Sequence, residues 1–416
     1  MQAALRKAVN FPKGLTSTIR RDPNSMANDI IVKTFEYKIR HTAAFTRAAN
    51  AALEASRFVY NCALEQRILR YRQGKPIGYV EQSRELTEAR TLPGVGRTLR
   101  MIQEDALKRL DAAFQAFFKR LTKGETPGFP RFKSAARYTT FSQQIEPQRG
   151  CPLNGDILTV PGVVRVRLRL SRPIEGTVKQ LRITRRVDGW YALLVCEIPR
   201  PLPQSKTGNS IGVDVGLTAF ATLSNGEKIN NPRYLRRKER ALKRSQRALS
   251  RKTRRSTGRV KARQRLAMQY LKIKRARKDF HHKIALDLVN RFDRIAVEDL
   301  QIPNMLKNHA LAKSIADAGW GQFTSILAVK AENAGREFVR VDPRYTSQTC
   351  SSCGHRQKMP LALRIFVCAK CNHTLDRDHN AAINIRRGAP VTPAESQRAL
   401  RRRNRLGRVT TTGPIL

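Results

Sequence analysis

Alternating apolar and polar positions predict a strand near the start of the chain, followed by a helical bundle. One side of the alternation over residues 30–39 carries Ile31, Lys33, Phe35, Tyr37 and Ile39. Residues 43–71 are helical in character. Between residues 99 and 121, apolar side chains recur three or four positions apart and form one stripe, namely Ile102, Ala106, Leu110, Phe114, Phe117 and Leu121. Such a stripe packs helix against helix, and we expect the bundle to end near Gly124.

Residues 137–200 have the pattern of a β-sheet instead. Valine and leucine alternate there with Arg165, Arg167 and Arg169, so one strand face is apolar and the other is a row of guanidinium groups. A solvated face and a surface that follows phosphates explain this row equally well. The pair Asp188-Gly189, between two apolar runs, predicts a hairpin turn. The strand near the start of the chain can join the same sheet, with the helices inserted between.

A third unit begins at Ser210, after a linker over residues 201–209. It opens as strand, turn and strand, with Asn225-Gly226 as the turn. Further along, the pattern predicts a strand at 294–298, a helix at 314–335 that ends at a glycine, and a strand at 336–341. This order of strands and helices is that of a mixed α/β nuclease sheet.

A basic helical stretch over residues 233–283 interrupts the third unit. Leu235, Leu242 and Leu249 recur seven positions apart and Gly258 breaks the pattern, which predicts a hairpin of two helices. The stretch holds about 20 lysines and arginines. A surface that faces nucleic acid explains this density better than a solvated face alone.

The overall composition restricts the partners of the chain. Its 416 residues suffice for two to four compact units and carry 81 Lys and Arg against 32 Asp and Glu, a formal net charge of +49. A chain this basic needs polyanions, so nucleic acid is the expected partner and a membrane surface the competitor. No apolar run approaches the roughly 20 residues of a spanning helix. Because Cys62, Cys151 and Cys196 are scattered, we expect a cytoplasmic protein without a disulfide framework.

Two cysteine pairs near the C-terminus have the spacing of a zinc site. Cys350-x2-Cys353 and Cys368-x2-Cys371 are separated by a loop that includes an apolar strand at 365–367. Thiolates select Zn²⁺, and a closed site of four cysteines is structural rather than catalytic. We therefore predict a zinc ribbon.

Two carboxylates lie in strands far upstream of the cysteines. The alternation over residues 211–216 places Asp214 opposite an apolar face, and Gly212 and Gly216 keep the backbone open to a close ligand. Glu298 ends a later strand, which is where α/β sheets place ligands. A buried carboxylate needs a cationic partner, which is either a structural salt bridge or a hard divalent metal. The glycines favour the metal.

Further acids begin a helix directly after the zinc motif. Asp376 suits the N-cap, and Asp378 would point from the first turn toward the sheet. Together, Asp214, Glu298 and Asp378 can hold two Mg²⁺ or Mn²⁺ ions about 3.5–4 Å apart and hydrolyse a phosphodiester without a covalent nucleophile. The residues alone therefore support a metal-dependent nuclease.

In combination, these motifs resemble the TnpB proteins, the OrfB products of transposon insertion sequences and relatives of the type V CRISPR effectors. The resemblance rests on Gly212-Val213-Asp214-Val215-Gly216, Val297-Glu298-Asp299-Leu300, Asp317-Ala318-Gly319-Trp320-Gly321, the four cysteines and Asp376-Arg377-Asp378-His379-Asn380-Ala381-Ala382. In the N-terminal half it rests on Arg57-Phe58-Val59-Tyr60-Asn61 and Gly128-Phe129-Pro130-Arg131-Phe132. The match spans roughly residues 28–388, and the combined set of motifs is highly specific.

The resemblance implies a multidomain α+β protein. Its parts would be a RuvC-like nuclease domain of RNase H fold with an inserted Cys₄ zinc ribbon, a β-barrel wedge domain and a helical recognition domain. The expected boundaries are an N-terminal extension (1–27), a wedge strand (28–41), the recognition domain (42–124), the wedge domain (125–205), the nuclease domain in two parts (206–344 and 374–390), the zinc ribbon (345–373) and a tail (391–416). We expect the extension and the tail to be disordered.

The resemblance also implies an RNA-guided DNA endonuclease with Asp214, Glu298 and Asp378 as its catalytic, magnesium- or manganese-binding residues. Its partners would be a guide RNA from the transposon end and double-stranded target DNA beside a short recognised motif, with the protein monomeric on its RNA in a bacterial or archaeal cytoplasm. Contacts to nucleic acid are expected at Arg165, Arg167, Arg169, Arg244, Arg254 and Arg255.

Three alternatives remain open at this point. An inactive repressor directed by guide RNA predicts the loss of at least one metal carboxylate. A transposase, or an accessory protein of one, predicts strand joining. A basic zinc-ribbon protein that binds RNA would leave Asp214 and Glu298 unexplained.

Overall fold

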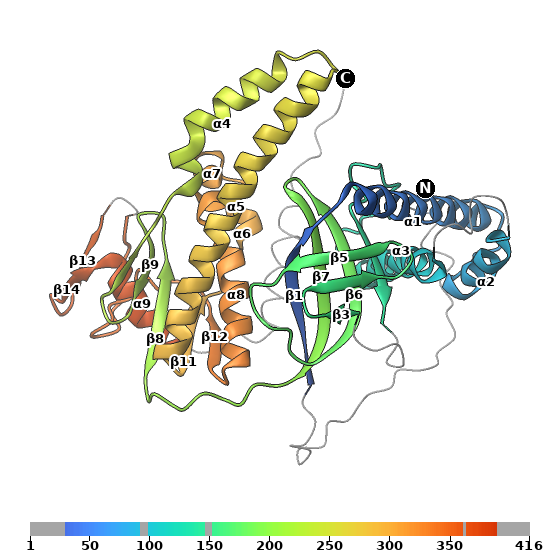
Figure 1. Cartoon of the computed structure of the whole chain (residues 1–416). Helices are drawn as coiled ribbons and strands as arrows, with labels where there is room; N and C mark the ends of the chain where they lie inside the picture. The colour runs from blue at the N-terminus through green and yellow to red at the C-terminus, as the bar shows by residue number, and fades with distance from the viewer. Residues whose placement is uncertain (1–29, 92–98, 146–151, 361–362, 389–416) are drawn as a thin grey trace. The chain divides into compact units, whose positions relative to one another are not determined.

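The computed structural model describes residues 30–91, 99–145, 152–360 and 363–388, which form two compact units (Figure 1). The first unit comprises the described residues up to Ile183 together with Ala192–Arg200. The second comprises Thr184–Tyr191 and the described residues from Pro201 onward. The extension and the tail that the sequence predicts to be disordered lie outside the described residues.

In the first unit, two helices pack against α3 (Arg100–Thr122). These are α1 (Ala43–Arg72) and α2 (Tyr79–Ala89). The predicted stripe on α3 is confirmed, since all of its members are buried except Leu121 in the last turn. The bundle ends at Thr122, close to the predicted Gly124. The hydrophobic pattern predicts α1 and α3 but not the short α2.

The first unit also contains a seven-stranded sheet that is strongly curled (Figure 1). Its strands are β1 (Ile30–Arg40), β2 (Thr140–Gln144), β3 (Leu153–Asn154), β4 (Ile157–Val160), β5 (Val164–Arg169), β6 (Thr177–Arg186) and β7 (Gly189–Pro199). They lie in the order β2-β6-β7-β1-β5-β4-β3, so β1 does join the sheet across the inserted helices. The alternation in β5 is confirmed, with Val166 and Leu168 buried and the three arginines exposed.

The second unit is built on a five-stranded mixed sheet. Its strands are β8 (Ser210–Val215), β9 (Ala219–Leu223), β10 (Lys228–Asn230), β11 (Arg294–Glu298) and β12 (Glu337–Val341), in the order β10-β9-β8-β11-β12. β8, β9 and β10 are antiparallel, whereas β11 runs parallel to both β8 and β12. The sequence predicts one turn in the first part of this sheet, at Asn225-Gly226. A second turn over residues 216–218 separates β8 from β9.

Helices cover both faces of this sheet. Alternate residues of β8 and β11 pack into a core with α5 (Thr257–Arg291) and α8 (Trp320–Asn333) on one face. On the other face, β11 and β12 pack against Ile385 of α9 (Arg377–Arg387). Because Val213 and Val297 belong to the α5/α8 core, their neighbours Asp214 and Glu298 face the α9 side.

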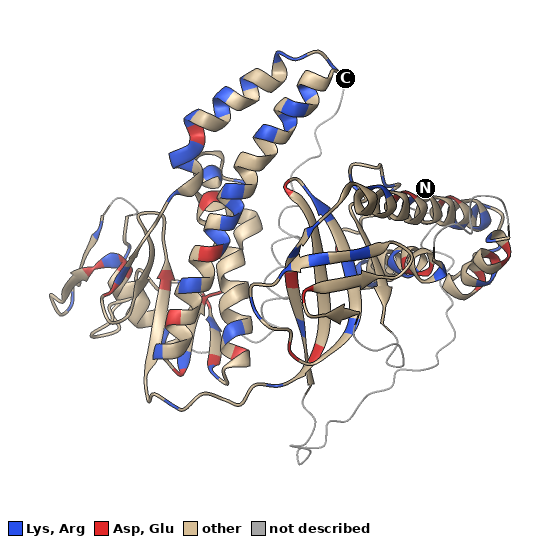
Figure 2. Ribbon diagram, in the orientation of Figure 1, with Lys and Arg blue, Asp and Glu red and all other residues tan. Residues whose placement is uncertain are grey.

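The basic hairpin of the second unit is formed by α4 (Tyr234–Ser250) and α5, and Figure 2 shows Lys and Arg along both helices. The predicted break at Gly258 is wrong by a few residues. Ser256 caps α5 by accepting the Arg259 N–H, so the helix begins before Gly258 and the turn lies at 251–256. Neither α5 nor any other helix of the described segments is long and apolar enough to cross a membrane.

The single helix predicted over residues 314–335 is two helices. After the short α6 (Ile302–Met305), α7 (His309–Ala318) ends and α8 begins at Gly319. Gly319 has a φ of 68°, a left-handed conformation that a glycine adopts without strain. Hydrophobic periodicity continues across this position, which is why the sequence pattern alone does not reveal the break.

Close packing of α9 on β8 leads to a first prediction. A Cβ on Gly212 would lie 2.0 Å from the Ala382 carbonyl oxygen and 2.5 Å from the Arg386 nitrogen, both backbone atoms of α9. We expect Gly212→Ala to lower the free energy of unfolding by about 1–3 kcal/mol, as overpacking does. Thermal unfolding measures this effect. The control is Gly258→Ala, where the nearest atoms would lie at 3.8 and 3.9 Å, and equal melting temperatures for the two variants would contradict the prediction.

Candidate functional site

Three predicted carboxylates lie on one side of the sheet of the second unit. Asp214 comes from β8, Glu298 from β11 and Asp378 from the first turn of α9, and all three are half-buried. In the parallel register of β8 and β11, Glu298 and Asp214 directly follow the pair Val297–Val213. Side chains from segments far apart in the sequence thus lie on the same, α9-facing side of the sheet.

Within this set, Asp214 is the carboxylate whose ionisation its surroundings oppose. Burial, and after it the negative charges of Glu298 and Asp378, raises the pKa of Asp214 well above its usual range, while Arg377 acts in the opposite direction. Burial also raises the pKa of Glu298, although the Thr346 hydroxyl partly offsets that effect. A nearby cation would favour the ionised form of such a carboxylate. Carboxylate oxygens are also the ligands that Mg²⁺ and Mn²⁺ prefer, so these donor types suit a hard divalent cation.

Asp376 is the N-cap of α9, as the sequence predicts. Its Oδ1 accepts the N–H groups of Asp378 at 3.0 Å and of His379 at 3.1 Å. Its Oδ2 lies 2.8 Å from the Lys228 ammonium group. Burial opposes ionisation of Asp376, but Lys228 and the helix N–H groups outweigh it, so its pKa is lowered. Both oxygens of this carboxylate are thus engaged, one by the helix N–H groups and the other by Lys228.

Two asparagines anchor α9 to the segment that leads into the zinc motif. Asn380, which is fully buried, accepts the Ser351 N–H and donates to the Thr349 carbonyl, both at 2.8 Å. Asn384 donates to the carbonyls of Thr346 at 2.9 Å and of Thr349 at 2.7 Å. These anchors determine where Asp378 lies. The sequence contains Asn380 within a recognised motif, but it gives no sign of the partners, which lie about 30 residues away.

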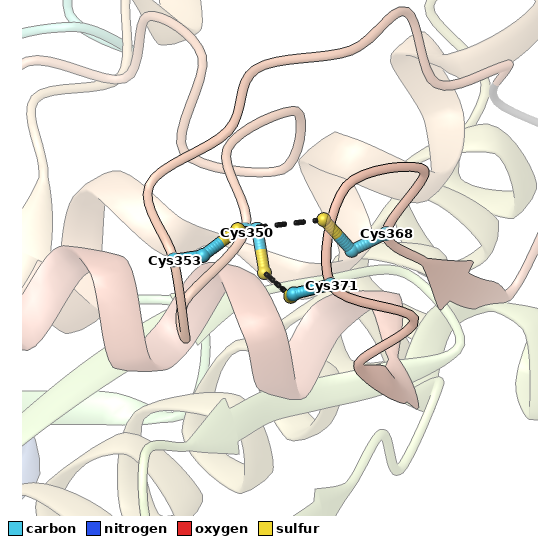
Figure 3. Close-up of side chains that lie close together, drawn as sticks. All are labelled: Cys350, Cys353, Cys368 and Cys371. Carbon is cyan, nitrogen blue, oxygen red and sulfur yellow. Dashed lines mark hydrogen bonds between the residues drawn. The ribbon is translucent and has the colours of Figure 1, made fainter.

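The four cysteines predicted to bind zinc converge, with their ligand atoms all within 4.8 Å of one another (Figure 3). The Cys350 and Cys371 sulfurs are 3.7 Å apart, and those of Cys353 and Cys368 are 3.6 Å apart. A tetrahedral site with Zn–S bonds of about 2.3 Å has sulfurs about 3.8 Å apart. The four cysteines can therefore hold a zinc ion.

A small hairpin completes the cysteine module. Its strands β13 (Ile365–Val367) and β14 (Thr374–Asp376) are antiparallel, and β13 is the apolar strand that the sequence predicts between the two cysteine pairs. Arg364, just before β13, has a guanidinium nitrogen 3.9 Å from Asp378 Oδ2. Because β14 runs directly into α9, the module ends where the acidic helix begins.

The arginines predicted to contact nucleic acid fall into two sets that belong to different units. In the first unit, Arg167 and Arg169 of β5 lie opposite Arg40 and Lys38 of β1. Like charges in opposite positions on neighbouring strands are unfavourable by themselves. The other set lies on the basic hairpin of the second unit, with Arg244 on α4 and Arg254 and Arg255 in the turn before α5, all three exposed.

Asp317, part of the recognised Asp317–Gly321 motif, fixes the base of the basic hairpin. Its carboxylate accepts the N–H groups of Leu235 and Arg236 at the start of α4 and lies 3.2 Å from an Arg277 nitrogen of α5. A carboxylate from α7 thus caps α4 and pairs with α5 at the same time. Its role is structural, and the sequence pattern does not reveal it because the capped helix lies about 80 residues upstream.

Comparison with protein families gives three matches. Residues 193–309 match a family described as "Probable transposase" (OrfB), and residues 320–385 match the "Cas12f1-like, TNB domain". Residues 26–76 match a family described as "Helix-turn-helix domain". Within the described part of that last range, however, the chain forms β1 and the single helix α1.

Individual relatives extend over most of the chain. A Streptomyces pristinaespiralis protein named "Putative RNA-guided DNA endonuclease" is 33% identical over 85% of this chain and 89% of its own length. The similarly named InsQ of Escherichia coli (strain K12) is 30% identical over 80% of this chain and 86% of its own length. Among solved structures, a cryo-EM structure of a Cas12f1–sgRNA–target DNA complex matches with a TM-score of 0.55 at 15% identity. That match covers 88% of this chain and 99% of the other, and it supports the fold alone.

Zinc binding by the four cysteines can be tested directly. We expect the purified chain to contain about one zinc ion per molecule and Cys350→Ser to lose it and to melt at a lower temperature, because a structural zinc contributes folding free energy. Atomic emission spectroscopy and thermal unfolding measure the two effects. Cys62→Ser is the control, since Cys62 is exposed on α1. Unchanged zinc content in Cys350→Ser would contradict the assignment.

The raised pKa of Asp214 predicts how stability depends on pH. The folded state binds the Asp214 proton more tightly than the unfolded chain, so the free energy of unfolding falls as pH rises from the ordinary Asp range through the raised pKa. We expect Asp214→Asn to raise the melting temperature at neutral pH by about 2–4 °C in the absence of Mg²⁺. The gain should shrink as pH falls, because protonated Asp214 carries no charge. Thermal unfolding over a pH series measures this gain in melting temperature. The buffer is cleared of divalent cations by resin, so that the protein retains its zinc. A gain that is independent of pH would contradict the prediction.

Proposed function

The chain belongs to the TnpB (OrfB) family, and from this membership we propose that it is an RNA-guided DNA endonuclease of a transposable element. Its substrate would be double-stranded DNA that matches a guide RNA from the transposon end and lies beside a short recognised motif. The observation that carries the proposal is the placement of Asp214, Glu298 and Asp378 on the α9 side of the sheet, where Glu298 and Asp378 oppose the ionisation of Asp214.

The proposed nuclease centre consists of these three carboxylates. They would hold Mg²⁺ or Mn²⁺, which when bound supplies an activated water and stabilises the leaving 3′-oxygen. Asp214 and Glu298 would contribute ligands from neighbouring parallel strands, and Asp378 would contribute one from the helix above them. The strand order β10-β9-β8-β11-β12, with α9 on one face, supports a RuvC-like nuclease of RNase H fold.

The remaining parts of the chain would bind nucleic acid or support the nuclease centre. Zinc at the cysteine module would be structural and would hold the segment that anchors α9. The first unit would correspond to the recognition and wedge domains, with the proposed boundaries at residues 42–124 and 125–205. Its row at Arg165, Arg167 and Arg169, and the hairpin with Arg244, Arg254 and Arg255, would follow the phosphates of guide RNA or its duplex with DNA.

Matched substitutions at the start of α9 test the proposed centre. Asp378→Asn should reduce cleavage of a guide-matched plasmid to below about 1% of wild type, an effect of the size seen when one transition-state contact is lost. Asp376→Asn should retain most of the cleavage, because asparagine is an equally good N-cap. Asp214→Ala and Glu298→Ala should behave like Asp378→Asn, and Asp279→Asn, an exposed residue of α5, should behave like wild type.

The assay uses the full chain expressed with its flanking transposon DNA, followed by sequencing of the co-purified RNA and cleavage of a plasmid library. Unchanged cutting by Asp378→Asn would overturn the three-carboxylate centre, and equal loss in Asp376→Asn would overturn the distinction between cap and ligand. Bound RNA without any cutting would favour the repressor, and absence of bound RNA would favour a transposase function.

A further inference from the structure

A hydroxyl group outside the three carboxylates contacts one of them directly. The Thr346 hydroxyl lies 2.6 Å from Oε1 of Glu298, and Thr346 is only 9% exposed. The hydroxyl also lies 3.3 Å from the Pro343 carbonyl oxygen. A hydroxyl has one proton, and the shorter contact with an ionised acceptor is the stronger hydrogen bond. The hydroxyl therefore donates to Glu298 and fixes one of its two carboxylate oxygens.

The turn that carries Thr346 is held on two sides. Within the turn, the N–H groups of Gln348 and Thr349 both bond to the Tyr345 carbonyl at 3.0 Å. On one side, the Thr346 carbonyl accepts the Asn384 amide of α9 at 2.9 Å. On the other side, the turn leads directly into Cys350 of the cysteine module. A single turn of residues 345–350 thus contacts a catalytic carboxylate, α9 and the cysteine module.

We propose that Thr346 is a positioning residue whose hydroxyl orients the Glu298 carboxylate toward a divalent cation. With Oε1 fixed by the hydroxyl, Oε2 is presented in one orientation instead of rotating freely. Hydrogen bonds of this kind to a ligating carboxylate commonly change metal affinity 10–100-fold when they are removed. The proposal rests on the proposed function, because it takes Glu298 to be a ligand of that cation.

Thr346→Val tests the proposal, since valine keeps the shape of threonine and removes the hydroxyl. We expect the Mg²⁺ concentration for half-maximal cleavage to rise about 10–100-fold, with a smaller change in the rate at saturating Mg²⁺. Mn²⁺ affinity of the protein–RNA complex, measured by electron paramagnetic resonance without DNA, should fall by a similar factor. Thr346→Ser keeps the hydroxyl and should restore both values. The control is Thr349→Val, which removes a hydroxyl of the same turn that bonds to the Tyr345 carbonyl instead of to a carboxylate.

A double-mutant cycle separates positioning from general support of the fold. If Thr346 acts through Glu298, then Thr346→Val should change Mn²⁺ affinity less than about twofold in a Glu298→Ala background. A loss of equal size in both backgrounds would overturn the proposal, because the effect would not pass through Glu298. If the valine variant melts below the assay temperature, Thr346→Ala replaces it in the same cycle.

The possible failures are distinguishable. A wild-type complex that neither binds Mn²⁺ nor cleaves DNA overturns the proposed function. A wild-type complex that does both, with Thr346→Val unchanged, overturns only the role of Thr346. The same conclusion follows if Thr346→Ser is as impaired as Thr346→Val, since the hydroxyl would then not be the group that matters.

Discussion

The burial of Asp214 beside two other carboxylates is the constraint on which the second unit depends. Burial and the negative charges of Glu298 and Asp378 oppose the ionisation of Asp214, so nothing in the chemistry of these acids draws them together. Packing elsewhere has to offset the cost of bringing them together. Gly212 lets α9 approach β8 without an intervening side chain, and Asn380 holds the helix at the other side. A cation bound beside Asp214 would favour its ionised form and reduce this cost.

Among the described residues, few positive charges pair closely with the three carboxylates. Lys228 pairs with the capping Asp376, and the Arg364 guanidinium lies at the longer distance of 3.9 Å from Asp378. Most of the excess of lysine and arginine lies elsewhere, including the helical hairpin and the face of β5. The basic surfaces and the three carboxylates therefore lie on different parts of the chain. The four cysteines, which can hold a zinc ion, form a third group.

A feature could be predicted from the sequence when the residues that determine it are close together in the chain. Strand alternation in β5 and β8, the cysteine spacing and the capping role of Asp376 depend on neighbouring residues, and the structure contains all of them. The break at Gly319 could not be predicted, because apolar periodicity continues across it. Thr346 and Asn380 were missed for a related reason. Their importance comes entirely from partners about 30 to 50 residues away, and one sequence without its fold does not reveal such pairs.

The position of α9 along the chain has a consequence for synthesis. Asp378 lies in the last helix among the described residues, so a growing chain on the ribosome carries Asp214 and Glu298 long before their third partner exists. Domains fold as the chain emerges, so the first unit and most of the second can fold while the set of three carboxylates is still incomplete. A chain released early, before α9, would keep its basic surfaces and lack the third carboxylate. The set of three acidic groups can therefore assemble only after the segment that ends in α9 has been made.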